Sequence, residues 1–321
     1  MIIISEQDAR TLVSFEDAIS AVERTFAAMA EDKATNYPVV REFVGMQDAV
    51  YGVKAGCDAS AMVLGLKAGG YWPGNLAKGL TNHQSSTVLF DPETGQASAV
   101  VSANYLTGVR TGAASAIATK YLSRPDSTVL GVIGTGAQAA YQLRANLVVR
   151  DFRSVHAWDP SAENLAEFGD LVRSLGLAFH GATDPDSVAA AVDVLITVTP
   201  SQQALVNKAA VRPGTHINAM GADTKGKNEL DPHLVAASAV FVDEKAQAIT
   251  IGECQHAYAA SLIGEDDFRG SIGAVIAKLC DGRRNADEIT LFDGTGVALQ
   301  DLVVADLCVR KARARGKTGG L

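Results

Sequence analysis

The stretch GVIGTGAQAAYQ, residues 131–142, decides the fold of this chain. It follows the strand-like run TVLGVI (128–133) and opens a helical pattern, which is the context of a dinucleotide-binding turn. Gly134 permits a tight turn, Gly136 lets the backbone approach a pyrophosphate, and the small Ala139 permits close packing of helix against strand. The N-terminus of the helix supplies unpaired N–H groups and partial positive charge for the phosphates. The alternative is a glycine turn that binds nothing.

An acidic residue stands where such a turn needs one. Asp159 ends the next strand-like run, SVHAWD (154–159), twenty-five residues after Gly134. A carboxylate at that position accepts hydrogen bonds from the adenosine ribose and repels a 2′-phosphate. The residues that follow, PSAEN, include no arginine to offset that repulsion. The pattern therefore predicts NAD(H) rather than NADP(H) as the cofactor.

Strand-like and helical runs alternate after Pro125. Five short apolar runs have the composition of buried strands: TVLGVIG (128–134), SVHAWD (154–159), VDVLITVT (192–199), GTHINAMG (214–221) and SAVFVD (238–243). Helical patterns lie between most of them, for instance at 137–149 and 161–174. This alternation predicts a doubly wound parallel sheet with helices on both faces.

The first 125 residues do not alternate in this way. Residues 14–30 have the apolar spacing of an amphipathic helix, and Ser14 and Asp17 are spaced as in a capping box. β-rich runs follow, and the turn DPETGQ (91–96) separates two of them as in a hairpin. We expect a mixed, largely antiparallel sheet with flanking helices. A final amphipathic helix, 296–314, is expected to cross back and pack on this domain.

The composition narrows the class of protein. Of 321 residues, 47% are hydrophobic and 20% charged, and the formal net charge of −8 argues against binding to nucleic acid or to an anionic membrane. The one basic cluster, RKARARGK (310–317), is interpreted as the solvated last turn of a helix rather than a nucleic-acid tail.

Cysteine usage and the chain start suggest a compartment. The four cysteines are scattered, with neither metal-ligand spacing nor a disulfide framework, so we expect a cytoplasmic protein with no metal site. Met1 leads directly into IIIS and a polar run, so no signal peptide is expected. No apolar run reaches the length of a membrane span.

Three cations in the first domain are candidates for holding an anionic substrate. Arg41 and Lys67 lie in β-rich, otherwise apolar runs, and Arg110 lies in the small-residue helix LTGVRTGAASAIATKYL (106–122). Arginine binds a carboxylate with two parallel hydrogen bonds, and lysine acts as a point charge or proton donor. The alternative is that each cation pairs with a structural acid or reaches water.

One acid in the second domain is a candidate for proton transfer. Asp223 lies in the loop after the fourth predicted strand, and parallel sheets bind ligands beyond the carboxyl ends of their strands. A carboxylate near a cationic substrate stabilises it or moves a proton. The alternative is a turn residue whose side chain bonds its own backbone.

Six motifs, in order, resemble the ornithine cyclodeaminase/mu-crystallin family over nearly the whole chain. They are GLKAGGYWPGN (65–75), TVLFDPETGQASAV (87–100), LTGVRTGAASAIATKYLSRP (106–125), GVIGTGAQA (131–139), GADTKGKNELD (221–231) and LFDGTGVALQDL (291–302). The resemblance implies a homodimer and hydride transfer at an amino-acid Cα or its imine. It also implies a mixed α+β substrate and dimerisation domain, 1–124 plus 298–321, with a Rossmann domain, 125–297, inserted into it.

The resemblance further implies roles for individual residues. Arg41, Lys67 and Arg110 resemble the binders of the substrate carboxylate, and Lys67 is also a candidate proton donor. Asp223 resembles the acid–base group near the substrate nitrogen. The residues that resemble cofactor contacts are Arg110, Thr111, Gly134, Gly136, Ala137, Gln138, Asp159, Thr199 and Gly221.

The segment GLTNHQSSTVLF (79–90) bears on the substrate. His83, Gln84 and Ser85 place polar donors where this segment is expected to line the site, which suits a second substrate carboxylate better than an aliphatic amino tail. We therefore expect an NADH-dependent reduction of a small imino acid, iminosuccinate to aspartate. The alternatives are an alanine dehydrogenase or other ketimine reductase, a redox-neutral ornithine cyclodeaminase, and a non-catalytic small-molecule binder. For the segment itself, the alternative is a loop whose polar residues face water.

Overall fold

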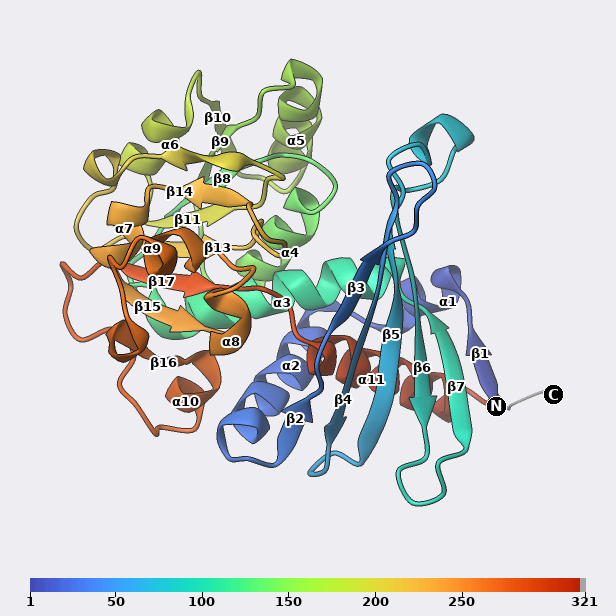
Figure 1. Ribbon diagram of the computed structural model, residues 1–321. Helices are drawn as coiled ribbons and strands as arrows, with labels where there is room; N and C mark the ends of the chain where they lie inside the picture. Colours follow the sequence, from blue (N-terminus) through green and yellow to red (C-terminus); the bar gives the residue numbers. More distant parts are fainter. Residues whose placement is uncertain (318–321) are drawn as a thin grey trace. The chain divides into compact units, whose positions relative to one another are not determined.

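The computed structural model describes residues 1–317, and the chain forms two compact units (Figure 1). The first contains Met1–Arg110 and the described residues from Val297 onward, and the second is Thr111–Gly296. The first boundary lies inside helix α3 (Asn104–Leu122), whereas the sequence analysis placed it after that helix. The first unit is therefore discontinuous in sequence, with the second inserted into it.

The first unit is a sheet with helices. Its elements are β1 (Ile2–Ile4), α1 (Glu6–Leu12), α2 (Phe15–Ala30), β2 (Ala34–Asn36), β3 (Val40–Phe43), β4 (Val50–Asp58), β5 (Val63–Tyr71), η1 (Leu76–Lys78), β6 (His83–Phe90), β7 (Ala97–Ser102), the first part of α3, and α11 (Ala298–Ala314). The strand order is β1-β7-β6-β5-β4-β2, and β3 also pairs with β4. Only β1 and β7 run parallel, so the predicted mixed, largely antiparallel sheet is confirmed.

Helix α11 covers one face of this sheet. It contacts β4, β5 and β6, and Figure 1 shows it beside α2 on that side. Glycines on the sheet permit the close approach: an ideal Cβ on Gly56 would lie 3.3 Å from Leu299 Cδ2, and one on Gly65 would lie 3.1 Å from Leu302 Cδ2. The predicted return of the C-terminal helix to the first unit is confirmed, as is the helix that begins after Ser14 with its capping box.

The second unit is a parallel α/β domain. Its elements are the rest of α3, β8 (Val129–Ile133), α4 (Ala139–Val149), β9 (Ser154–Trp158), α5 (Ala162–Ser174), β10 (Ala178–Gly181), α6 (Pro185–Ala191), β11 (Val194–Thr197), β12 (Gln202–Val206), η2 (Lys208–Ala210), β13 (His216–Ala219), β14 (Asn228–Leu230), α7 (Pro232–Ala236), β15 (Ala239–Val242), α8 (Lys245–Ala248), α9 (Gln255–Ala259), η3 (Glu265–Asp267), β16 (Phe268–Ser271), α10 (Ile272–Ile276) and β17 (Thr290–Asp293).

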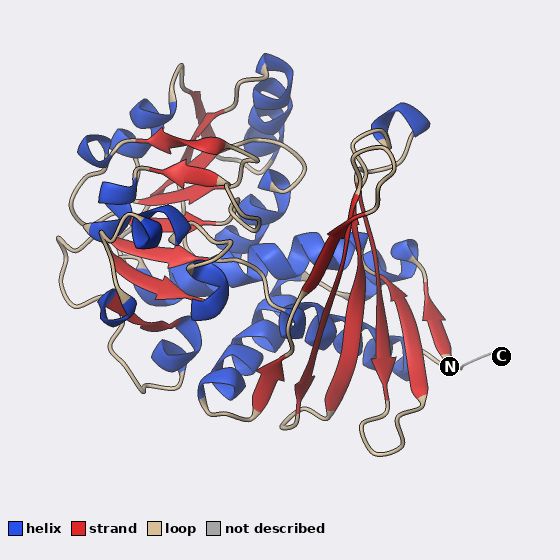
Figure 2. Ribbon diagram, in the orientation of Figure 1, coloured by secondary structure: helices blue, strands red, loops and turns tan. Residues whose placement is uncertain are grey.

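All strands of the main sheet in this unit are parallel, in the order β10-β9-β8-β11-β13-β17-β15-β16. Helices lie on both sides of the sheet (Figure 2), so the predicted Rossmann-type fold class is confirmed. The five predicted strands are β8, β9, β11, β13 and β15. The other strands of this sheet, β10, β16 and β17, were not predicted, because the runs AFHG, FRGS and TLFD contain too few consecutive apolar residues to mark a buried strand.

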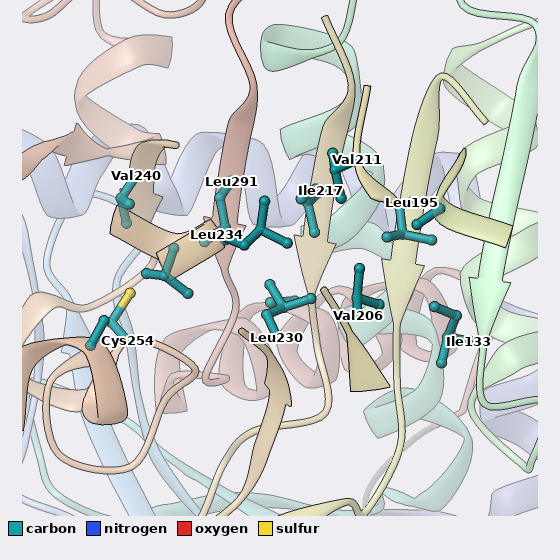
Figure 3. Close-up of a cluster of buried hydrophobic side chains, with 14 of the residues drawn as sticks. Ile133, Leu195, Val206, Val211, Ile217, Leu230, Leu234, Val240, Cys254 and Leu291 are labelled. Atoms are coloured by element: carbon teal, nitrogen blue, oxygen red, sulfur yellow. The ribbon is translucent and has the colours of Figure 1, made fainter. Parts of the chain in front are cut away.

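Aliphatic side chains from this sheet and its helices form a continuous buried core. Figure 3 shows Ile133, Leu195 and Ile217 from neighbouring strands packed with residues such as Leu234 from helix α7. The strands β8, β11 and β13 are adjacent and parallel, so their carboxyl ends share one edge. That edge carries the glycine turn. Among the described residues, no helix is both long and apolar enough to span a lipid bilayer.

Candidate active site

The glycine turn after β8 is built on a close backbone approach. Gly134 has a φ of +91°, and an ideal Cβ there would lie 2.7 Å from Thr199 Cγ2 and 2.9 Å from the carbonyl oxygen of Val198. The Gly134 N–H donates to the Trp158 carbonyl at 2.9 Å. A side chain at this position would meet both a strained φ and the chain that leaves β11. Only glycine therefore fits, and the turn is held against the ends of two neighbouring strands.

The next glycine differs, because the protein's own packing does not require it. No heavy atom lies within 4 Å of an ideal Cβ on Gly136, and no left-handed φ is found there. Thr135 Oγ1 and Gln138 Oε1, on either side, are buried without hydrogen-bond partners within the described residues. The turn leads directly into α4, so the positive end of the helix dipole faces the turn. These features fit the pyrophosphate of a nicotinamide dinucleotide.

Asp159 lies just beyond β9 and is bonded to the glycine turn. Its Oδ2 accepts from the Thr135 N–H at 2.7 Å, and its Oδ1 accepts from the Ser161 N–H at 2.8 Å. A carboxylate oxygen has more than one acceptor position, so both oxygens can still accept hydrogen bonds from ribose hydroxyls. The half-buried carboxylate therefore has two roles available, orienting the turn and reading the ribose.

The sequence analysis missed Glu229, which joins the loops after β11 and β13. This fully buried carboxylate accepts from Thr197 Oγ1 at 2.7 Å, from the Thr199 N–H at 2.6 Å and from the Gly221 N–H at 3.0 Å. An ideal Cβ on Gly221 would lie 2.5 Å from the Glu229 carboxyl group. Glu229 thus positions two residues that resemble cofactor contacts. Glu229 lies in the motif GADTKGKNELD (221–231), but the motif alone does not show which groups its carboxylate contacts.

Asp223, the predicted acid–base group, lies in the loop after β13. Its Oδ1 accepts from Lys227 Nζ at 2.7 Å and from Thr224 Oγ1 at 3.1 Å. Lys227 Nζ also donates to the Gly221 carbonyl at 3.0 Å. The side chain of Asp223 is 38% exposed, so a pairing of this kind contributes little to stability and leaves the carboxylate accessible.

The remaining predicted cofactor residues lie where the chain enters the second unit or begins α4. Thr111 is the first residue of the second unit and is half-buried in α3. Ala137 is exposed in the turn before α4.

The substrate-binding candidates belong to the first unit, and strand register places most of them on one face of its sheet. Lys67 on β5 pairs with Lys54 on β4, and Arg41 on β3 pairs with Gly52, two residues from Lys54. Directly opposed residues and residues two apart point to the same face. On β6, His83 and Ser85 pair with Tyr71 and Gly69, in the same alternation as Lys67.

Register places Gln84 apart from this group. It pairs with Gly70, so its side chain leaves the opposite face of the sheet from Lys67. Its Nε2 donates to the Thr81 carbonyl at 2.9 Å, and its Oε1 accepts from Asn104 Nδ2 at 3.1 Å. The structure therefore brings His83 and Ser85 to the face of Lys67 and does not bring Gln84 there. The strict two-residue alternation of a strand is the reason, since three consecutive residues cannot share a face.

A buried carboxylate joins two of the predicted cations. Asp301 on α11 accepts from Lys67 Nζ and from Arg110 Nε through its Oδ1, both at 3.0 Å. Arg110 Nη1 donates to Gln300 Oε1 at 2.8 Å, and Lys67 Nζ donates to Thr107 Oγ1 at 3.2 Å. The exposed fractions of the Lys67, Arg110 and Asp301 side chains are only 8%, 9% and 2%. Lys67 and Arg110 therefore both pair with a buried acid, as the alternative interpretation of these cations expects.

The sequence analysis did not find Asp301 or Gln300. Asp301 lies 234 positions from Lys67 in the chain, and only the return of α11 to the first unit brings the two together.

The charges in this cluster shift its pKa values. Burial lowers the pKa of Lys67 to about 8, although the charge of Asp301 acts to raise it, and Arg110 and Lys54 lower it further. Burial acts to raise the pKa of Asp301, but the charges of Arg110 and Lys67 outweigh it and the pKa is lowered. Asp301 therefore stays ionised, whereas Lys67 can exchange a proton near neutral pH. That is the property of a general acid.

Donors remain available on both cations. A protonated lysine has three N–H donors and an arginine has five. Among the described residues, Lys67 uses two of these donors and Arg110 uses two. The donors that remain match what a substrate carboxylate requires.

Comparison with known protein families identifies the family of this chain. The model of the ornithine cyclodeaminase/mu-crystallin family matches residues 2–316. The chain belongs to this family. The resemblance seen in the six motifs is confirmed.

Two known proteins are similar to this chain over nearly their whole length. The iminosuccinate reductase of Paracoccus denitrificans (strain Pd 1222) is 51% identical over 316 residues, which cover 98% of this chain and 98% of that protein. The crystal structure of that enzyme in complex with NAD+ has a TM-score of 0.94 to this chain at 50% identity, covering 98% and 97%. An archaeal alanine dehydrogenase dimer with bound NAD has a TM-score of 0.94 at 36% identity, covering 100% and 98%.

A second group of buried carboxylates lies beyond the carboxyl ends of β15 and β17. Asp293 Oδ2 accepts from the Cys254 N–H at 2.9 Å, and its Oδ1 is buried without a hydrogen-bond partner within the described residues. Burial raises the pKa of Asp293 from 3.8 to about 7, although the Cys254 and Glu253 N–H groups act to lower it, and the charge of Asp243 raises it further. The folded state therefore holds a proton on Asp293 that the unfolded chain releases near pH 4.

We predict that this proton makes the stability of the chain depend on pH. A group whose pKa is raised on folding stabilises the fold fully below its unfolded pKa, and this contribution is lost as the pH rises through about 7. At ~1.4 kcal/mol per pKa unit the loss is of the order of a few kcal/mol. The amide of Asp293→Asn cannot ionise, and it keeps a carbonyl oxygen for the Cys254 N–H. The Tm of the variant minus the Tm of the unsubstituted chain should therefore be larger at pH 8.5 than at pH 5.5.

Calorimetry at both pH values measures this difference. Asp170→Asn removes a carboxylate whose side chain is 79% exposed and serves as the matched control, with no pH-dependent difference expected. A Tm difference for Asp293→Asn that is the same at both pH values would contradict the assignment.

Proposed function

We propose that this chain is an NADH-dependent imine reductase that converts a small imino acid into an amino acid, with iminosuccinate to aspartate as its reaction. The observation that carries the proposal is the buried Lys67, with a pKa of about 8, beside Arg110 on the shared Asp301 carboxylate. The proposal is supported by the 51% identity to the iminosuccinate reductase of Paracoccus denitrificans.

The cofactor belongs, in this proposal, to the second unit. Gly134, Gly136 and the start of α4 hold the pyrophosphate, Asp159 binds the adenosine ribose, and Glu229 orients the loops that carry Thr199 and Gly221. When bound, NADH supplies the hydride for the imine carbon. The cofactor assignment is supported by the two similar solved structures, one in complex with NAD+ and the other with bound NAD.

The substrate is held by the first unit. Arg110 and Lys67 bind the α-carboxylate with the donors that Asp301, Gln300 and Thr107 leave available, and Arg41 adds charge from the same sheet face. Reduction of an imine adds one hydride to carbon and one proton to nitrogen. Lys67 is largely protonated at neutral pH and is acidic enough to release that proton. Asp223 is the other candidate to move a proton at the substrate nitrogen, and protonation there makes the carbon more electrophilic.

We also propose that two copies of the chain associate through the open face of the first sheet. Strand register aligns Ile3, Val100, Val88, Leu66 and Ala55 across five strands, on the face opposite to α11. Ile3 is 56% exposed, and the other four residues are half-buried. An apolar face of this extent is typical of a subunit interface. The archaeal alanine dehydrogenase is described as a dimer, which supports a second copy as the occupant.

The compartment we propose is the cytoplasm. All four cysteines are free thiols, which suits a reducing environment.

The activity is tested by mixing the protein with NADH, oxaloacetate and ammonia and following the absorbance of NADH. We predict oxidation of NADH with oxaloacetate, and loss of at least a thousandfold in kcat for Lys67→Met with unchanged NADH binding, because the proton donor and a carboxylate ligand are removed together. The control is Lys33→Met, a lysine whose side chain is 58% exposed.

Parallel assays separate the other activities. Preferred turnover of pyruvate and ammonia would point to alanine dehydrogenase, and release of ammonia from ornithine without net NADH use would point to a cyclodeaminase. NADH binding without turnover of any mixture would point to a non-catalytic binder. Loss of NADH binding in Lys67→Met would contradict the place given to that lysine.

We predict that Asp159→Ala changes the cofactor preference. Removing the carboxylate abolishes its repulsion of a 2′-phosphate, so kcat/KM for NADPH relative to NADH should rise at least tenfold. The absolute value with NADH should fall, because the Thr135 N–H loses its acceptor. Steady-state kinetics with both cofactors measures the ratio, and an unchanged ratio would remove Asp159 from the ribose site.

We predict that Leu66→Glu separates the dimer into monomers that remain folded. A carboxylate within the apolar row, between Val88 and Ala55, would have to be buried unpaired at the interface. Sedimentation velocity measures the mass, and Leu279→Glu, at a leucine that is 63% exposed in the second unit, is the matched control. A monomeric unsubstituted chain, or a dimer that persists in Leu66→Glu, would overturn the proposed interface.

A further inference from the structure

We propose that Lys54 determines specificity for a dicarboxylic imino acid by binding the second carboxylate of the substrate, the one not held by Arg110 and Lys67. The inference rests on the proposed function and deepens it, because it assigns a residue to the feature that distinguishes a dicarboxylate from a monocarboxylate. Lys54 was not among the residues that the sequence analysis singled out.

Strand register carries the geometry of this proposal. Lys54 on β4 and Lys67 on β5 are directly opposed in an antiparallel pair, so their side chains leave the same face of the sheet. Neighbouring strands are about 4.8 Å apart. Two ammonium groups at that spacing on flexible stems can contact the two carboxylates of a four-carbon acid at the same time. Lys54 is half-buried, so its charge is less screened than that of a surface lysine.

Beside the two lysines, a row of paired residues crosses four strands, and its two inner residues are glycines. Across β3, β4, β5 and β6 it reads Arg41, Gly52, Gly69 and Ser85. The glycines are required by close backbones, since an ideal Cβ on Gly52 would lie 2.8 Å from the Val40 carbonyl oxygen and one on Gly69 would lie 2.2 Å from the Gln84 carbonyl oxygen. This bare backbone is bordered by Arg41, Ser85 and the two lysines, which are all suited to binding anionic oxygen.

The balance of charge favours a dianion. Arg41, Lys54, Lys67 and Arg110 contribute four cations to this group, and Asp301 is the acid that Lys67 and Arg110 share. The charge of Lys54 lowers the pKa values of Lys67 and Asp301, so it acts directly on both. His83, on the same face, adds a further titratable group. A dicarboxylate offers one anionic group to Lys67 and Arg110 and a second to Lys54, whereas a monocarboxylate has only one such group to offer.

A merely structural role for Lys54, as a member of the ion cluster around Asp301, makes a different prediction. Loss of a structural cation changes Lys67 and Asp301 for every substrate alike. Loss of a specificity residue acts on the dicarboxylate only. The ratio between two substrates therefore separates the two roles.

The test compares Lys54→Met, Lys54→Arg and the control Lys33→Met with the unsubstituted chain. With NADH and ammonia, kcat/KM for oxaloacetate should fall at least tenfold in Lys54→Met and stay within threefold for pyruvate. Lys54→Arg keeps the charge and should retain most of the preference for oxaloacetate. Equal losses on both substrates, or no loss on either, would overturn the proposal.

A binding measurement keeps this test independent of turnover. Titration calorimetry of the protein saturated with NAD+ should show succinate binding weakened at least tenfold by Lys54→Met and propionate binding unchanged. If the unsubstituted chain reduces neither imine, the proposed function fails, and the calorimetric ratio still decides the role of Lys54. If it reduces the oxaloacetate imine and Lys54→Met retains the succinate preference, the role of Lys54 fails alone.

Discussion

The pairing of the Asp301 carboxylate with two buried cations is the interaction on which the polar cluster of the first unit depends. Two cations, Lys67 and Arg110, are buried side by side, and such a pair is unstable without a counter-charge. Asp301 supplies that charge from α11, so the helix that closes the hydrophobic face of the sheet also makes the cluster electrostatically possible. The same pairing leaves donors available on both cations. Burial lowers the pKa of Lys67 to about 8, and the charge of Asp301 limits that decrease.

Glu229 has the corresponding position in the second unit. One buried carboxylate receives hydrogen bonds from the loops after β11 and β13, and the glycine turn after β8 packs against the first of these loops. The edge of the parallel sheet is thus held by a polar network rather than by side-chain packing alone. Both oxygens of Glu229 accept hydrogen bonds, and such bonds hold the loops in one geometry, which a dinucleotide site requires. In both units, a buried acid positions residues that we propose as ligand contacts.

Local patterns predicted a large part of this arrangement. The turn at Gly134 and Gly136, the five buried strands of the second unit, the helix after Ser14 and the return of the C-terminal helix all follow from spacing along the chain. Three strands were missed, β10, β16 and β17, because their runs are short and contain few consecutive apolar residues. The interpretation of His83, Gln84 and Ser85 as one polar group was incomplete, because alternation along β6 sends Gln84 to the other face.

The sequence by itself determined the family, the class of each unit and the cofactor expected, and it singled out the cations that we propose for an anionic substrate. These follow from residues close together in the chain, where glycine geometry, helix capping and hydrophobic period act locally. Only the tertiary structure decided which acid pairs with those cations, which lysine opposes Lys67 and which carboxylate holds the cofactor loops. Asp301 and Glu229 lie within family motifs, but the local sequence does not show their contacts or that of Lys54. Each of the three acquires its role from a strand register or a packing of elements that joins distant parts of the chain.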